Sequence, residues 1–149
     1  TTRDHMSALI KKWHTLIDTF VDAKTNDGFL LRLFAFAISR KKKTQQRATS
    51  YLQLSQTKQI RKIMTSIISK EVKKSTLKEL VPKLLSADNE IANEITEKSS
   101  KIFPIQNVMI RKVKTIKRPR FDITQLLSMH TENTTVLSAP VQEAKEVKA

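Results

Sequence analysis

Two stretches of the sequence carry clustered positive charge and no acidic residue. Phe29 to Lys70 contains ten lysines and arginines and Lys98 to Phe121 contains eight, in a chain of 149 residues whose net charge is +14. Charge of one sign gathered in this way destabilises an isolated fold and favours a polyanionic partner. Lysine and arginine bind phosphates and release counterions when they do so. The sequence therefore predicts a nucleic-acid-binding protein.

The candidate RNA contacts are cations at a predicted strand end, on a predicted helix face, and along a predicted strand and its exit, since phosphate contacts must converge from several elements to follow a backbone. A single basic run would be better explained as a solvated face, but two acid-free stretches favour nucleic acid. The candidates are Arg32, Arg40, Lys41, Lys42, Lys43, Arg47, Lys58, Arg61, Lys62, Arg111, Lys112, Lys114, Lys117, Arg118 and Arg120.

The aromatic residues favour recognition of RNA shape over reading of its bases. Aromatics make up 5% of the chain and no strand is rich in them, unlike sheets that stack bases on an aromatic platform. Trp13, Phe34 and Phe36 are predicted to be core residues. Tyr51 and Phe121 border basic runs and could stack on a base, although core packing is favoured for each.

The sequence shows no constellation typical of an enzyme, a metal site or a membrane protein. The three histidines lack metal-ligand spacing, cysteine is absent, and one glycine cannot build a phosphate-binding loop. The acidic positions Glu90, Glu94 and Glu97 are better explained as a solvated face than as paired catalytic carboxylates. No apolar run reaches the roughly 18 residues of a spanning helix. We expect no catalytic residue, no cofactor, no metal and no membrane partner.

A helix followed by a hairpin is predicted for the first part of the chain. Apolar residues at helical spacing favour a helix over Thr1–Trp13, capped by Thr2 and ending near His14. Asp27-Gly28 between two apolar runs is a strong hairpin signal. Leu16–Lys24 and Phe29–Ser39 are therefore expected to pair as antiparallel strands. The second strand is nearly continuously apolar, which predicts burial on both faces.

A basic connection and two helices are predicted next. The connection, Arg40 to Leu54, has no hydrophobic period. An amphipathic helix follows over about Ser55–Lys73, with an apolar stripe opposite its cations. Thr76 and Glu79 form a capping box that opens another helix, and the proline at position 82 should kink or shorten it.

The last part of the chain predicts a helix over about Asp88–Ser99 and a strand over Ile105–Lys117. A bulge near Arg111–Lys112 would reconcile the strand's imperfect alternation. Asp122 starts a short helix to about Met129. The predicted fold is mixed α/β (α+β), with an antiparallel hairpin and a later strand in a mixed sheet flanked by about four to five helices. Residues 1–130 form the RNA-binding domain and residues 131–149 a flexible, disordered tail.

Long collinear motifs run through most of the chain. They are Thr2-Arg3-Asp4, Lys12-Trp13, Val21 to Thr25, Asp27 to Phe34, Thr49-Ser50-Tyr51, Gln59 to Lys62, Val108, Arg111 to Lys114, Lys117-x-Pro119-x-Phe121 and Leu126 to His130. In content and order they closely resemble the S1e family, also known as S3Ae, of small ribosomal subunit proteins in eukaryotes and archaea. The likeness covers roughly Thr2 to Glu132.

The resemblance implies a structural protein bound to small-subunit ribosomal RNA on the platform, near the messenger exit. Its partners would be neighbouring platform ribosomal proteins and initiation factors, with no homo-oligomer. It would be located in the cytoplasmic ribosome and, in a eukaryote, would pass through the nucleolus during assembly. The alternative is a non-ribosomal basic chaperone or architectural protein on DNA or RNA.

The sequence departs from the family pattern at three places. The family normally has a basic, strand-rich part before the residues matching Thr2, and that part is absent here. Pro82 falls within an expected helix, and Thr131 replaces a glycine common after the last histidine. These departures affect the helix at Thr76 and the tail, and they leave the core assignment unchanged.

Overall fold

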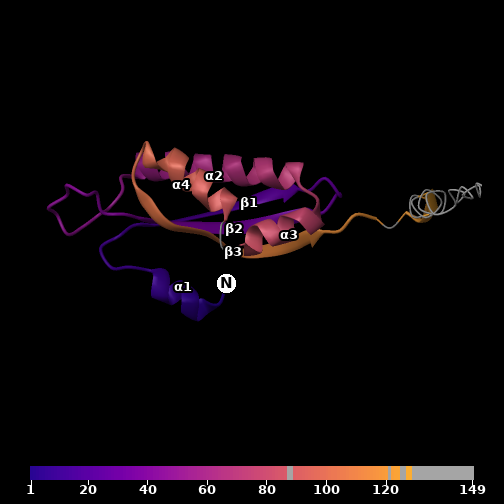
Figure 1. Ribbon diagram of the computed structural model, residues 1–149, viewed down its shortest axis with the longest axis horizontal. Helices are drawn as coiled ribbons and strands as arrows, with labels where there is room; N and C mark the ends of the chain where they lie inside the picture. The colour runs from indigo at the N-terminus through magenta and orange to yellow at the C-terminus, as the bar shows by residue number, and fades with distance from the viewer. Residues whose placement is uncertain (87–88, 121, 125–126, 129–149) are drawn as a thin grey trace, which may run out of the picture. The chain divides into compact units, whose positions relative to one another are not determined.

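The computed structural model describes residues 1–86, 89–120, 122–124 and 127–128. It contains two compact units, residues 1–119 and 120–149. The first unit holds every named element (Figure 1): α1 (Arg3–Leu9), β1 (Leu16–Lys24), β2 (Leu30–Ser39), α2 (Leu54–Lys74), α3 (Leu77–Leu85), α4 (Glu90–Ser100) and β3 (Ile105–Lys117). The strands form a sheet in the order β1-β2-β3, so the mixed α/β class is confirmed. Both strand pairings are antiparallel. The expectation of a sheet that mixes parallel and antiparallel strands is therefore wrong for these three strands.

The predicted hairpin is present, with β2 beginning one residue later than expected. Gly28 adopts a φ of 85°, a left-handed conformation that costs glycine nothing because it has no Cβ. Thr25 closes the turn, since its hydroxyl accepts from the Phe29 amide at 3.1 Å and its carbonyl accepts from the Gly28 amide at 3.1 Å. The turn also reaches a distant helix, because Asp27 Oδ2 accepts from the Leu77 amide of α3 at 2.7 Å.

The predicted bulge in β3 is confirmed. Phe34 pairs with Lys112 whereas the next residue, Ala35, pairs with Ile110, so Arg111 has no opposite partner on β2. The extra residue restores the alternation and puts Ile110 and Val113 on the same face of the sheet. Without it, one of these two apolar side chains would face away from the helices.

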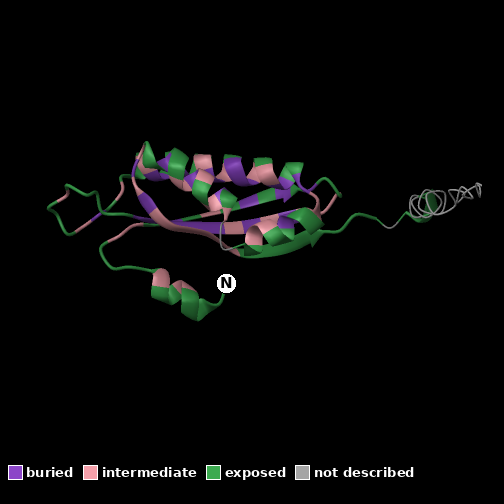
Figure 2. Ribbon diagram, viewed as in Figure 1, coloured by how far each residue is buried: buried purple, intermediate pink, exposed green. Residues whose placement is uncertain are grey.

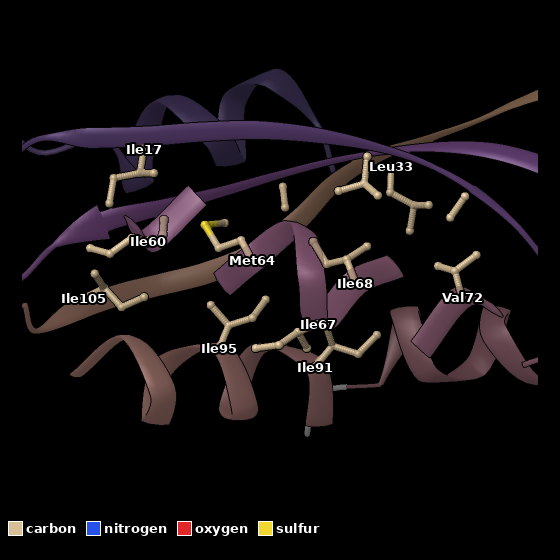
Figure 3. Packing of buried hydrophobic residues seen from close by; sticks show 14 of the residues in the cluster. Ile17, Leu33, Ile60, Met64, Ile67, Ile68, Val72, Ile91, Ile95 and Ile105 are labelled. Carbon is tan, nitrogen blue, oxygen red and sulfur yellow. The ribbon is translucent and has the colours of Figure 1, made fainter. Parts of the chain in front are cut away.

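The hydrophobic core lies between one face of the sheet and the helices α2, α3 and α4. The apolar stripe of α2 is buried as its spacing predicts (Figures 2 and 3). Met64 and Ile68 pack against the sheet, and Ile95 of α4 joins the same cluster. The helix-facing side chains of β2 complete it: Leu31, Leu33, Ala35 and Ala37.

The opposite face of the sheet is only partly covered. Phe36 and Ile38 are buried there, but Arg32 and Phe34 are half-buried. The expectation that β2 is buried on both faces therefore holds only near its C-terminal end. The prediction of a core role is confirmed for Phe36 and wrong for Phe34. We call this surface the open face.

Helix α1 ends earlier than predicted, at Leu9 rather than near His14. Thr2 caps it as expected, since its hydroxyl accepts from the His5 amide at 3.4 Å. Trp13 has a positive φ of 68° and its carbonyl accepts from the Ser50 amide at 2.9 Å, so the chain leaves the helix to pair with a distant loop. The predicted core role of Trp13 is wrong because its side chain is 50% exposed.

Helix α3 starts at the predicted capping box and is nine residues long, ending three residues after Pro82. The proline has no N–H to donate to the preceding turn, which accounts for a short helix.

In the second unit, Asp122 accepts from the Thr124 amide at 3.1 Å, as a cap should. Phe121, Met129 and the predicted tail at residues 131–149 lie outside the described residues. Among the described helices, none is both long and apolar enough to cross a membrane.

Candidate nucleic-acid interface

The connection between β2 and α2 is an ordered loop that carries five of the predicted contacts: Arg40, Lys41, Lys42, Lys43 and Arg47. Gln45 organises it from within. The two hydrogens of its side-chain Nε2 are shared among the Arg47 carbonyl at 3.0 Å, the Thr49 carbonyl at 2.6 Å and the Ser50 hydroxyl at 3.2 Å. One half-buried amide thus fixes the path of the whole loop.

A second set of hydrogen bonds joins this loop to the end of β2. The buried Ser39 hydroxyl donates to the Ser50 carbonyl at 2.6 Å and accepts from the Thr15 amide at 2.8 Å. His14 Nδ1 donates to the Ser39 carbonyl at 2.6 Å. Because buried polar groups are costly when unpaired, this network holds the loop in place against the sheet.

The first turns of α2 bring three more cations to the same end of the sheet. Lys58, Arg61 and Lys62 are exposed, and Arg61 Nε donates to the Asp18 carbonyl of β1 at 3.1 Å. We call these residues and the loop cations together the loop-end group: Arg40, Lys41, Lys42, Lys43, Arg47, Lys58, Arg61 and Lys62. Within the described part of the chain, no ion pair involves any of them.

A second group follows β3 toward its far end. Lys112 and Lys114 lie opposite Phe34 and Arg32, so they face the open side, and Lys117 lies opposite Leu30. We call Lys112, Lys114, Lys117 and Arg118 the strand-end group. All four are exposed.

The loop-end group lies at one end of the sheet, and the strand-end group extends from Lys112, opposite Phe34 in the middle of β2, to the other end. Ser39, beside the loop, pairs with the first residue of β3, whereas Leu30 pairs with the last. Nine residue steps along a strand span roughly 30 Å. Figure 2 shows both ends as exposed. The structure therefore brings the predicted contacts together as two separate patches and not as one. Arg120 belongs to the second unit.

Arg32 and Arg111 differ from the other candidates because carboxylates already bind them. Arg32 makes two hydrogen bonds of 2.6 Å to Asp22, and Arg111 lies 3.1 Å from Asp18. The hydrogen bond from Arg32 lowers the pKa of Asp22, and the same bond raises the pKa of Arg32. These carboxylates already offset the charge of both arginines, so a phosphate gains less from binding either of them. The hairpin register places Asp22 opposite Arg32, so this pairing could have been anticipated from the sequence.

Aromatic rings and cations also meet on the open face. Phe20 and Phe34 lie 6.3 Å apart between ring centroids. The guanidinium of Arg32 lies 5.4 Å from the Phe20 centroid, and that of Arg111 lies 5.6 Å from Phe34. A cavity of about 820 Å³ beside Phe34 is lined by Arg3 and Met6 of α1 and by strand-end lysines.

The residues described offer no site for metal chemistry, since no three His, Cys, Asp or Glu side chains among them gather closely enough to hold an ion.

The sequence analysis missed Gln45, because nothing in the residues around it indicates that its side-chain amide would hold the loop. It also favoured a core position for Tyr51, whose side chain is 58% exposed.

One comparison with known proteins identifies the chain. The model of the Ribosomal S3Ae family matches residues 1–119, which include all seven helices and strands of the first unit. Proteins of this family are components of the small ribosomal subunit. Among the motifs that resemble the family, Gln59 to Lys62 on α2 contains two members of the loop-end group, and Arg111 to Lys114 on β3 contains two of the strand-end group. The chain belongs to the Ribosomal S3Ae family of small ribosomal subunit proteins.

Proposed function

We propose that this protein is a structural component of the small ribosomal subunit that binds ribosomal RNA through phosphate contacts of the loop-end and strand-end groups. Family membership by itself implies a ribosomal protein of the cytoplasmic ribosome, with ribosomal RNA and other ribosomal proteins as partners and a structural role. The proposal adds to this the particular cations that contact the RNA.

The loop-end group is the observation that carries the proposal. Eight cations gather there on a loop fixed by Gln45 and on the start of α2. Neighbouring cations that no carboxylate pairs with repel one another, and a bound phosphate backbone removes that repulsion. The carboxylates of Asp18 and Asp22 form ion pairs with Arg111 and Arg32, and not with the loop-end group. The protein's own acids therefore leave the loop-end group available to an external anion.

The separation of the two groups supports contact with two stretches of RNA. Along β2, Lys112 lies five residue steps from Ser39, roughly 17 Å, and Lys117 lies nine steps away, roughly 30 Å. The open face between them contains two arginine–carboxylate pairs. A protein built in this way would bind two RNA segments at different places on one hydrogen-bonded sheet.

The finer location is part of the same proposal. We infer from the family resemblance that the protein lies on the platform near the messenger exit, beside other platform proteins and within reach of initiation factors. In a eukaryote it would pass through the nucleolus during assembly.

Sedimentation of the tagged full chain from cell lysate on sucrose gradients tests the proposal. Wild-type protein should migrate with small subunits and polysomes and stay there at moderate salt. Changing Lys41, Lys42 and Lys43 to glutamate should impair incorporation while leaving the helix content by circular dichroism unchanged. A slowly sedimenting wild-type pool would instead favour a free architectural or chaperone protein, and normal incorporation of the variant would remove these lysines from the interface.

A further inference from the structure

A small cavity lies in the loop between β2 and α2, beside the one tyrosine of the chain. Its volume is about 410 Å³, within the range of small-ligand sites and far too small for a duplex. The residues that line it are Lys42, Thr44, Gln45, Arg47, Thr49, Ser50, Tyr51 and Phe103. None of these described lining residues is acidic, and two are cationic.

We propose that this cavity receives a single unpaired nucleotide of RNA, with its base stacked on the Tyr51 ring and its phosphate bound by Lys42 and Arg47. The proposal rests on the proposed function and deepens it, since it adds an aromatic contact to an interface otherwise made of phosphate contacts. It also specifies an RNA feature, a bulged or looped-out nucleotide, that this end of the protein would prefer.

The first argument is the exposure of Tyr51. A tyrosine that served only the core would be buried, but this residue is 58% exposed. Base stacking on an aromatic ring needs an accessible face and tolerates any base, because every base has a π surface. Phe103, another lining residue, is 8% exposed, and Lys42 Nζ lies 5.3 Å from the centroid of its ring, a contact that favours a position of this cation beside the cavity.

The second argument is that the cavity is built before any ligand arrives. Gln45 holds the carbonyls of Arg47 and Thr49, at 3.0 and 2.6 Å. Ser39, buried at the end of β2, holds the Ser50 carbonyl immediately before Tyr51. A preorganised site avoids the entropic cost of ordering a loop on binding. The adjacent Arg40 amide donates to the Pro104 carbonyl at 2.8 Å, which ties the loop to the start of β3.

The experiment compares two hairpin RNAs bound by the full chain, each with its loop replaced by a non-nucleotide linker, one with a fully paired stem and one with a single unpaired adenosine in the stem. Wild-type protein should bind the bulged hairpin more tightly. Tyr51→Ala should weaken binding of the bulged hairpin by roughly 5- to 150-fold, the effect of removing a stacking aromatic, and leave binding of the paired hairpin unchanged. Tyr51→Phe should keep the preference. Phe20→Ala removes another exposed aromatic, 60% exposed on the sheet, and should change neither affinity.

A fluorescent base provides an independent readout on the wild-type protein. With 2-aminopurine as the unpaired nucleotide, binding should quench its fluorescence if the base stacks on Tyr51, and Tyr51→Ala should abolish that quenching. Equal affinity for the two hairpins, or no quenching, would overturn the nucleotide site. If both hairpins still bind and lose affinity when the loop lysines are removed, the proposed function stands; failure to bind either RNA would overturn both.

Discussion

Removing the three consecutive lysines of the loop should change the salt dependence of RNA binding by a predictable amount. Lys41, Lys42 and Lys43 are exposed and lie on a loop held by hydrogen bonds. Each phosphate contact contributes about 0.9 to the slope of log K against log salt on duplex and about 0.7 on single strands. If all three bind phosphates, the triple alanine variant should have a slope shallower by about 2.1 to 2.7.

That difference has a measurable consequence for affinity. Between roughly 50 and 200 mM salt, the ratio of wild-type to variant affinity should fall by about 20- to 40-fold. Filter binding of transcribed small-subunit RNA across this range gives the slope directly. Circular dichroism of each protein confirms that the fold is retained.

The chain offers a matched control for this variant. Lys70, Lys73 and Lys74 lie on the last turns of α2, are exposed, and carry the same charge. Changing these three to alanine removes the same net charge far from the loop and should alter the slope much less. Equal slopes for the two triple variants would refute the reasoning, since binding would then depend on total charge and not on the loop.

Three further predictions concern stability. Met64→Ala should destabilise the fold by about 2–5 kcal/mol, because Met64 is fully buried between α2 and the sheet; denaturant unfolding measures this, and a loss under 1 kcal/mol would contradict the packing. Gly28→Ala should cost about 1–2 kcal/mol at a φ of 85°, seen as a lower melting temperature. Because the hydrogen bond from Arg32 lowers the Asp22 pKa below 3.8, the stability it contributes is present above that value and lost as the pH falls through the lower folded pKa. Asp22→Asn should therefore lower the stability above pH 3.8 and make little difference at acid pH, where the wild-type carboxyl is itself protonated; an equal loss of stability at every pH would contradict the pairing.

Local signals in the sequence were sufficient for most of the elements. Asp27-Gly28 fixed the hairpin, the box at Thr76 and Glu79 fixed the start of α3, and the misplaced Val113 revealed the bulge. Each of these features depends on neighbours within a few residues. The end of α1 could not be found in the same way, because the Trp13 conformation depends on a hydrogen bond from Ser50.

The arrangement of the cations depends on the relative direction of β2 and β3, which the sequence analysis did not predict. Arg40 follows the end of β2 and Lys117 ends β3, so both stand at the C-terminal end of a strand. In parallel strands these ends would meet at one edge and the cations would form one patch. The strands are antiparallel, so they lie at opposite ends. Composition predicted a large positive charge, but the positions of the cations on the fold depend on the direction of the strands.

The central position of β2 has a consequence for the nascent chain. Strand β2 ends at Ser39, but the strand that covers its second edge ends at Lys117. At about 5–20 residues per second, translation would leave that edge unpaired for roughly 4–16 s. A long apolar strand with a free edge can pair with other chains. Until β3 emerges, therefore, the newly made protein is at its most vulnerable to aggregation, and this is the interval in which a chaperone or early docking on RNA would matter most.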